Sequence, residues 1–498
     1  MPGGHALACE TNARRSPPGN RITGLRTFLS RNSKYPVCPF QLKTSGVAIR
    51  ACDPAFQKPQ RRRGSSNVRR SIVHEGAGQL TYEIREIVAV AKKMEAVGLS
   101  VTWENIGDPI QKGESFPSWM KEILADLVAE DASYAYSDTQ GIRPTRQFLA
   151  DLVNARGGCQ ITGDDILFFN GLGDAVAKVF GFLRREARVI GPSPAYSTLS
   201  SAEAAHSGYD HLTYRLDPSR SWLPDLDDLE AKVKYNDAVA GLLLINPDNP
   251  TGVVYERDFL ERMVDIARRY GLFVIADETY ANITYNGAKP CSLSQVLGGV
   301  PGLSLRSISK EYPWPGARCG WIEVFNKNEN PEFRRYIDSL LAAKRLEVCS
   351  TSLPQLTIPR IMGDPRYPAH LERRRELFGS RARQAFAALD GIPGVKVILP
   401  QGALYFTVLF EPGALDGDRS LPPANAEVGA LVSGLVDRVA PDKRFVYHLL
   451  ASTGICTVPL TGFCSDLPGF RMTLLETDDA KREWIFQTVA QALRTYLS

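Results

Sequence analysis

A lysine that could act as a nucleophile follows an apolar segment in the second half of this 498-residue chain. The segment Ser304–Ile308 is predicted to be a strand, and it leads through Ser307 and Ser309 to Lys310, with Arg318 eight residues further on. A lysine amine that is partly removed from water gives up its proton more easily and can then attack a carbonyl carbon. Hydroxyl and guanidinium groups beside it could bind a phosphate. The pattern favours a catalytic lysine next to an anion site, although an ordinary surface lysine after a strand would give the same few residues.

A carboxylate and a phenol follow a second apolar segment, Phe273–Ala276. Asp277 comes directly after this segment, and Tyr280 stands three residues later. A carboxylate next to the nitrogen of a pyridine ring keeps that nitrogen protonated, so the ring can accept an electron pair. A phenol could stabilise an oxygen on such a ring. The alternative is structural, because an aspartate after a strand often caps a helix.

Two turns could present polar groups to the same ligand. The sequence Asn-Pro-Asp-Asn-Pro-Thr-Gly follows a predicted strand, and the side-chain amide of its Asn249 could donate to a ring oxygen. Gly171 and Leu172 lie between a predicted strand and a predicted helix, where backbone N–H groups and the helix dipole attract an anion. A simple strand-to-helix turn remains open as the interpretation of this second signal.

A single arginine stands in an apolar segment near the carboxyl terminus, Phe470–Leu474. Arginine is rarely buried without a partner, so Arg471 is expected to pair with an anion. Its planar fork of donors matches a substrate carboxylate. An internal salt bridge would satisfy the same guanidinium equally well.

These residues need one sheet edge to bring them together. Short apolar runs alternate with amphipathic segments from about residue 164, which predicts an α/β fold with a mostly parallel sheet, and such sheets bind ligands at the carboxyl ends of their strands. The expected strands are Ile166–Phe169, Arg188–Ile190, Gly241–Ile245, Phe273–Ala276, Ser304–Ile308 and Trp321–Val324. The expected helices are residues 82–96, Ala175–Leu183, Asp258–Tyr270 and Pro331–Lys344. A smaller α+β domain is expected beyond about residue 365, with a helix at His370–Leu389 and strands at Val395–Leu399 and Leu404–Phe410.

The charge of the chain is unevenly distributed. Residues 1–70 hold 14 lysines and arginines against Glu10 and Asp53, a net charge of +12, which leaves −8 for the rest of the +4 total. The acidic body argues against a nucleic-acid partner, and no apolar run reaches the roughly 18 residues of a membrane span. Nine cysteines without a C-x-x-C pair favour reduced thiols and a cytoplasmic protein, and we expect no metal site. The basic segment, residues 1–75, is predicted to be a disordered extension, with an organellar transit peptide as the alternative.

Taken together, the motifs resemble those of the class I/II aminotransferases, which are pyridoxal-phosphate (PLP) enzymes of fold type I. The family pattern has Asn-Pro-x-Asn-Pro-Thr-Gly, Asp-x-x-Tyr, Ser-x-Ser-Lys with a downstream Arg-x-Gly, and a late arginine, and all four are present here in that order. The resemblance runs from about Leu80 to the carboxyl terminus. It implies an α/β/α sandwich that binds PLP at residues 121–360, an amino-terminal arm and part of the small domain at 76–120, and the remaining small domain at 361–498. The implied reaction moves an amino group from an α-amino acid to a 2-oxo acid by a ping-pong mechanism.

The resemblance also implies roles for individual residues toward PLP. Lys310 would form the Schiff base with the cofactor, and Asp277 would pair with the ring nitrogen. Tyr280 and Asn249 would contact the ring oxygen, and Tyr196 would stack on the ring. The residues that would bind the phosphate within the same chain are Gly171, Leu172, Ser307, Ser309 and Arg318.

Substrate contacts and a second subunit are implied in the same way. Arg471 would hold the α-carboxylate, with Gly107 and Asn249 lining the substrate site, and Tyr136 would reach the phosphate of the partner subunit in a homodimer. An acidic substrate would need a second arginine to bind its side-chain carboxylate, and Arg345 and Arg143 are the candidates. An apolar substrate would pack against aromatic side chains, for which the candidates are Tyr405, Trp119 and Trp314. The alternative enzyme is a PLP-dependent lyase or a cyclopropane-carboxylate synthase on the same fold. An amino-acid-sensing regulator is disfavoured, because residues 1–75 show no helix-turn-helix pattern.

Overall fold

The computed structural model describes residues 72–80 and 83–498. These residues belong to one unit that begins at Ser71. The predicted basic extension, residues 1–75, therefore lies almost wholly outside the described residues, and its role stays a prediction. Within the described part of the chain, no helix combines the length and the apolar character needed to cross a bilayer.

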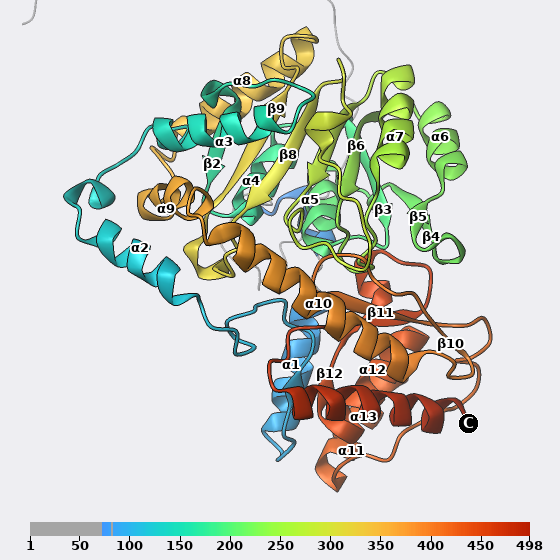
Figure 1. Ribbon diagram of the computed structural model, residues 1–498. Helices are drawn as coiled ribbons and strands as arrows, with labels where there is room; N and C mark the ends of the chain where they lie inside the picture. The colour runs from blue at the N-terminus through green and yellow to red at the C-terminus, as the bar shows by residue number, and fades with distance from the viewer. Residues whose placement is uncertain (1–71, 81–82) are drawn as a thin grey trace, which may run out of the picture. The chain divides into compact units, whose positions relative to one another are not determined.

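The structure has a larger and a smaller part, called the larger layer and the smaller layer below. An eight-stranded sheet lies at the centre of the larger layer (Figure 1). Five neighbouring strands pair in parallel, and β9 and β5 run antiparallel to their neighbours, as expected for a mostly parallel sheet. Each of the six predicted strands is present, with ends within three residues of those expected. In spatial order the strands are β2 (Ile166–Phe169), β9 (Gly320–Phe325), β8 (Gly302–Ser307), β7 (Phe273–Asp277), β6 (Val239–Ile245), β3 (Arg188–Ser193), β4 (Thr213–Asp217) and β5 (Leu223–Pro224).

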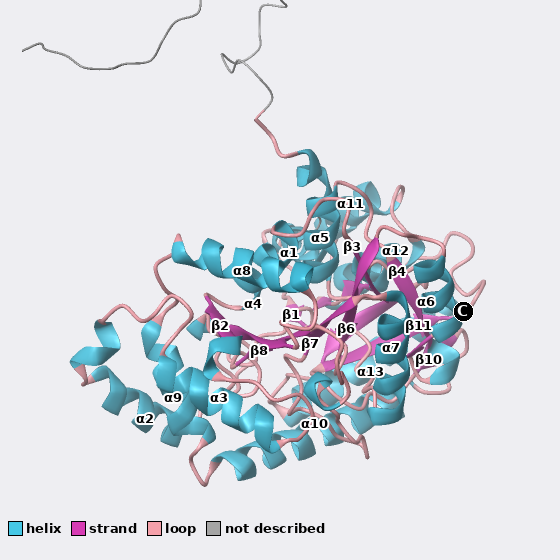
Figure 2. Cartoon of the chain, turned by 90° about the horizontal axis from the view of Figure 1, so that it is seen from above, coloured by secondary structure: helices cyan, strands magenta, loops and turns pink. Residues whose placement is uncertain are grey.

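Helices cover both faces of this sheet (Figure 2). Successive residues of a strand point to opposite faces, so Leu243 and Ile245 of β6 enter one apolar core while Leu242 and Leu244 enter the other. The first core is closed by α4 (Leu172–Gly181), α5 (Ser197–Ser207) and α8 (Pro331–Arg345). The second is closed by α3 (Arg143–Ala155), α6 (Leu226–Lys234), α7 (Arg257–Tyr270) and α9 (Ser352–Met362). The α/β/α sandwich is confirmed.

The last third of the chain builds a second, antiparallel sheet, which confirms the smaller α+β layer. Its strands, in order, are β10 (Val395–Val397), β11 (Tyr405–Phe410), β14 (Gly469–Thr473) and β13 (Val458–Pro459). The helices of this layer are α11 (Ala426–Val436), α12 (Pro441–Thr453) and α13 (Asp479–Leu497). The domain limits at residues 120 and 360 stay predictions.

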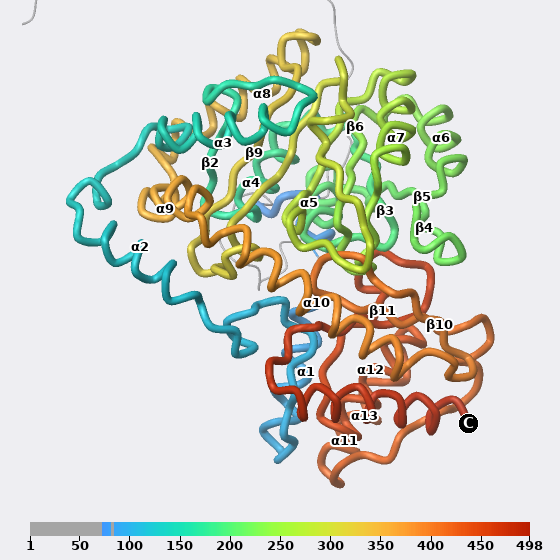
Figure 3. Tube along the Cα trace, viewed as in Figure 1, coloured from blue at the N-terminus to red at the C-terminus, as the bar shows by residue number. Residues whose placement is uncertain are grey.

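The amino-terminal segment joins this carboxyl-terminal layer (Figure 3). Strand β1 (Thr102–Trp103) pairs in parallel with β12 (Ile455–Cys456), and α1 (Glu83–Glu95) contacts β12 and β13. After α2 (Ser118–Val128) the chain enters the larger layer, and the 23-residue helix α10 (Tyr367–Leu389) leads back to the smaller one. The segment between β1 and α2 therefore lies where the two layers meet.

Candidate active site

The predicted residues of the large sheet lie at or just after strand ends, on the edge formed by the carboxyl ends of the parallel strands. Asp277 is the last residue of β7 and Ser307 the last of β8, and Lys310 follows three residues later. Because β9 runs antiparallel, its first residue, Gly320, pairs with Ser307 and brings the preceding Arg318 to the same edge. The carboxyl edge of the sheet thus gathers motifs that are far apart in the sequence.

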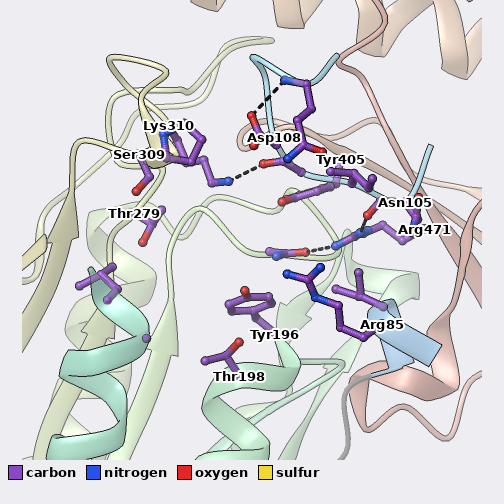
Figure 4. Close-up of a pocket in the computed structure, with 18 of the residues that line it drawn as sticks. Arg85, Asn105, Asp108, Tyr196, Thr198, Thr279, Ser309, Lys310, Tyr405 and Arg471 are labelled. Carbon is purple, nitrogen blue, oxygen red and sulfur yellow. Dashed lines mark hydrogen bonds between the residues drawn. The ribbon is translucent and has the colours of Figure 1, made fainter. Parts of the chain in front are cut away.

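A cavity of about 800 Å³ opens at this edge, between the sheet and the smaller layer (Figure 4). All but two of the predicted site residues line it: Gly107, Leu172, Tyr196, Asn249, Asp277, Tyr280, Ser307, Ser309, Lys310, Arg318 and Arg471. Gly171 lies directly behind Arg318. Tyr136 is 86% exposed on the surface of its own chain.

Lys310 points into the cavity, where its Nζ donates a hydrogen bond to the carbonyl oxygen of Gly107 (Figure 4). Gly107 has no room for a side chain, because a Cβ atom there would lie 2.3 Å from the hydroxyl of Tyr405. That hydroxyl is 2.9 Å from the hydroxyl of Tyr280. Burial and the neighbouring Tyr405 raise the pKa of Tyr280. The part of the cavity wall next to the Lys310 amine thus consists of the Gly107 backbone and the hydroxyls of Tyr405 and Tyr280.

Asp277 is a buried carboxylate with one free side. Its Oδ1 accepts hydrogen bonds from the backbone N–H of Thr279 at 3.0 Å and from its hydroxyl at 2.6 Å. Its Oδ2 has no hydrogen-bond partner among residues 72–80 and 83–498. Burial raises the pKa of Asp277, and the hydrogen bonds from Thr279 oppose this effect. A turn, and no helix, follows the residue, so the helix-capping alternative is wrong.

Arg471 is buried on the opposite wall, with 1% of its surface exposed. Its two terminal nitrogens donate to Oδ1 of Asn249 at 3.1 Å and to the carbonyl oxygen of Asn105 at 2.7 Å. Its guanidinium carbon lies 4.3 Å from the ring centroid of Tyr405. No carboxylate of the described residues forms a salt bridge with it, which removes the internal salt bridge as an explanation. A buried cation with neutral partners favours an anionic ligand.

An anion cradle lies at the start of α4. Gly171 has a φ of +86°, and a Cβ atom there would lie 2.3 Å from Nη2 of Arg318. Helix α4 begins at Leu172, and the first N–H groups of a helix have no acceptor within it. The Leu172 side chain instead packs on Gly320, where a Cβ atom would lie 3.0 Å from its Cδ2. With the hydroxyl of Ser309 on the cavity wall, this corner supplies the donors that a phosphate needs.

Several cavity residues were not foreseen. Asn105 is fully buried on the wall, and neither its amide nitrogen nor its amide oxygen has a hydrogen-bond partner within the described chain. Arg85 of α1, Thr198 of α5 and Thr279 also line the cavity (Figure 4). These are common residue types without a local motif, so the sequence alone gives no signal for them.

Of the residues considered for the substrate side chain, Tyr405 lines the cavity. Trp119 and Trp314 do not, because Trp119 packs against His370 and Trp314 against Phe116. The arginine candidates Arg143 and Arg345 are exposed at helix ends away from the cavity. Arg85 is the arginine that reaches the cavity in their place.

The sequence profile of the family described as aminotransferase class I and II matches residues 104–484. The chain belongs to this family. The resemblance on which the site was predicted is therefore confirmed, and the chain is an aminotransferase that acts on small molecules. The relatives described next are named aminotransferases, and the lyase alternative is not favoured.

Other members of the family resemble the chain over most of its length. It is 54% identical over 430 residues to an uncharacterised aminotransferase of Methanocaldococcus jannaschii, covering 86% of this chain and 100% of that one. It is 30% identical over 386 residues to an alanine aminotransferase of Mycobacterium bovis, covering 77% and 83%. Among solved aminotransferases, one from Escherichia coli superposes with a TM-score of 0.74 at 25% identity, covering 87% of this chain and 100% of that chain. An alanine aminotransferase from Pyrococcus furiosus gives 0.72 at 26% identity, covering 85% and 99%.

The cavity fits the cofactor that this family implies, PLP. A pyridine nitrogen needs a carboxylate, and Asp277 keeps one oxygen free while the other is held by Thr279. A phosphate needs several donors in a space without side chains, and the Gly171–Arg318 corner provides that arrangement. An aldehyde needs an amine within the same cavity, and Lys310 offers one.

Proposed function

We propose that this cavity is the active site of a PLP-dependent aminotransferase in which Lys310 binds the cofactor covalently. One observation carries the proposal: a lysine amine, a buried carboxylate with a free oxygen and a helix N-terminus beside Arg318 line the same cavity. When bound, PLP supplies an electron-accepting ring that weakens the Cα–H bond of an amino acid joined to it. The remaining steps fall to side chains of this chain.

Three side chains divide the work in this proposal. Arg471 binds the α-carboxylate with its planar fork and so fixes the position of Cα in the cavity. Lys310 would take the proton from Cα and return it to the former aldehyde carbon of the cofactor, on the other side of the amino nitrogen, acting as a base and then as an acid. Asp277 holds the proton on the ring nitrogen, because its free oxygen is an acceptor in a buried place.

The two half-reactions share one cavity, so the first product must leave before the second substrate enters, and we expect ping-pong kinetics. Adding an amino acid alone to the PLP-loaded protein should yield one equivalent of 2-oxo acid and pyridoxamine phosphate. A β- or γ-lyase would instead release ammonia together with its 2-oxo acid and leave the cofactor as PLP. Ammonia release without pyridoxamine phosphate would refute the aminotransferase reaction.

Alanine and glutamate are the amino donors we propose to test first. Relatives carry the names alanine aminotransferase and glutamate-pyruvate aminotransferase, the second from Escherichia coli at 29% identity over 327 residues. Besides Arg318 and Arg471, Arg85 gives the cavity a third guanidinium, which could bind the side-chain carboxylate of glutamate but has no such partner in alanine. Arg85→Ala should raise the KM for glutamate and leave the KM for alanine unchanged. Arg345→Ala, at an exposed helix end, is the control and should change neither.

A homodimer with shared active sites is also part of the proposal. Tyr136 and Tyr134 are 86% and 71% exposed, which is unusual for two neighbouring aromatic side chains. If Tyr136 contacts the phosphate of a partner subunit, Lys310→Ala and Tyr136→Phe damage different halves of a shared site. Mixing the two variants should then restore activity, since a mixed dimer contains one intact site. Restoration would be absent if each chain worked alone.

The location of the protein stays a prediction. The cysteine pattern favours the cytoplasm, and the basic segment, residues 1–75, keeps organellar import open. Fluorescent fusions of the full chain and of residues 72–498 would decide between the two locations, because the shorter fusion lacks nearly all of the basic segment and any import signal in it.

A further inference from the structure

Three side chains of α10 bond Lys310 and the residue after it, two of them through main-chain carbonyls. Tyr367, His370 and Arg374 lie on one face of the helix, since residues three and four positions apart stack above one another. Arg374 Nη2 donates to the carbonyl oxygen of Lys310 at 2.9 Å. His370 Nε2 lies 2.8 Å from the carbonyl oxygen of Glu311, and the Tyr367 hydroxyl donates to a carboxylate oxygen of Glu311 at 2.9 Å. Both peptide carbonyls at and after the lysine are therefore bonded to the same helix.

Arg374 also connects the lysine to the opposite wall of the cavity. Arg374 as a whole is 3% exposed, and its guanidinium forms an ion pair with Glu114. Glu114 belongs to the segment between β1 and α2, which also contains Gly107, the acceptor of the Lys310 Nζ hydrogen bond. The same segment contacts the loop after Lys310 a second time, through Phe116 and Trp314. One guanidinium thus joins the main chain of Lys310 to the segment that its amine contacts.

We propose that Arg374 is a positioning residue for Lys310, holding the lysine backbone and the Gly107 segment at a fixed separation. This inference rests on the proposed role of Lys310. A lysine side chain has four rotatable bonds, so the place of its amine depends on how firmly its backbone is held. Arg374 does not line the cavity, and Arg471 binds the carboxylate, so a loss of Arg374 should slow the proton transfer and leave substrate binding nearly intact.

Arg374→Lys tests the inference, because lysine keeps the charge but cannot bond the Lys310 carbonyl and Glu114 with a planar fork. Its matched control is Arg373→Lys, on the same helix and exposed. We expect Arg374→Lys to lower kcat by about 10- to 100-fold, with KM changed by less than about threefold. The pH at which bound PLP changes its absorbance should also shift, whereas Arg373→Lys should match the wild type in all three measurements.

Two further variants separate positioning from loss of folding. Glu114→Gln removes the counter-charge from the other end, and we expect a smaller fall in kcat, since the hydrogen bond to the Lys310 carbonyl remains. Arg374→Ala should regain part of its kcat when guanidinium is added at millimolar concentration, which a general weakening of the fold would not show.

The outcomes are distinguishable from those of the proposed function. If the wild type transaminates and Arg374→Lys has the kcat, KM and absorbance titration of Arg373→Lys, the positioning role is refuted while the function stands. If the wild type neither binds PLP nor transaminates, the function is refuted and the positioning role falls with it.

Discussion

Replacing Arg471 by lysine should weaken the binding of the α-carboxylate of every amino donor. The guanidinium bonds Asn249 and the carbonyl of Asn105 and lies over the ring of Tyr405. A lysine ammonium keeps the charge, but its single nitrogen cannot hold both neighbours and a carboxylate in one plane. At least one hydrogen bond to a charged group is lost, worth about 1.5–3 kcal/mol.

With about 1.36 kcal/mol for each tenfold change, that loss corresponds to a decrease in kcat/KM of about 10- to 150-fold. Steady-state rates with alanine and with glutamate, each at varied concentration against a 2-oxo acid, measure it directly. Arg381→Lys is the matched control, because Arg381 is also buried and donates to a backbone carbonyl next to β14 but does not line the cavity. A kcat/KM for Arg471→Lys within threefold of the wild type, for both donors, would refute the assignment.

Two other changes test separate parts of the site, and a third tests a buried carboxyl outside the cavity lining. Asp277→Asn should lower kcat by about 100-fold or more, because an amide cannot hold the ring nitrogen protonated, while absorbance still shows bound PLP. Gly171→Ala should weaken PLP binding by at least about tenfold in a fluorescence titration, since a Cβ atom strains a positive φ and displaces Arg318, whereas Gly181→Ala in the same helix meets open space and should bind normally. Burial raises the pKa of Asp248 from 3.8 to about 7. The folded state therefore binds this proton more tightly than the unfolded state, and the free energy of unfolding should fall as the pH rises from about 4 to 7. Denaturant unfolding at several pH values should show a smaller decrease in the free energy of unfolding between about pH 4 and 7 for Asp248→Asn than for the wild type. Identical pH profiles of the variant and the wild type would refute this role of Asp248.

The edge of the large sheet could be predicted because its signals are local. Each strand there is a short apolar run that ends in a polar motif, so Asp277 and Lys310 could be placed at the carboxyl edge from the sequence alone. The family resemblance then ordered these motifs around one ligand. The structure brings the same residues to one cavity, within a few residues of the expected strand ends.

The remaining parts of the site depend on contacts between segments far apart in the chain. Arg85 reaches the cavity because α1 packs against the carboxyl-terminal layer, and a helix pattern does not say which layer it will join. The helix-cap alternative for Asp277 stayed open because the sequence does not show that Thr279 bonds its oxygen in a turn. Arg374 carries no motif, and its importance follows only from the hydrogen bond to Lys310 across the fold.

The covalent bond between Lys310 and PLP is the most direct test of the account. Reduction of the PLP-loaded protein with borohydride, followed by proteolysis and mass spectrometry, locates the lysine that carries the cofactor. The account predicts one phosphopyridoxyl group per chain, on the peptide that contains Lys310, and none in Lys310→Ala. A label on Lys92, which also lines the cavity, or the absence of any label, would contradict it.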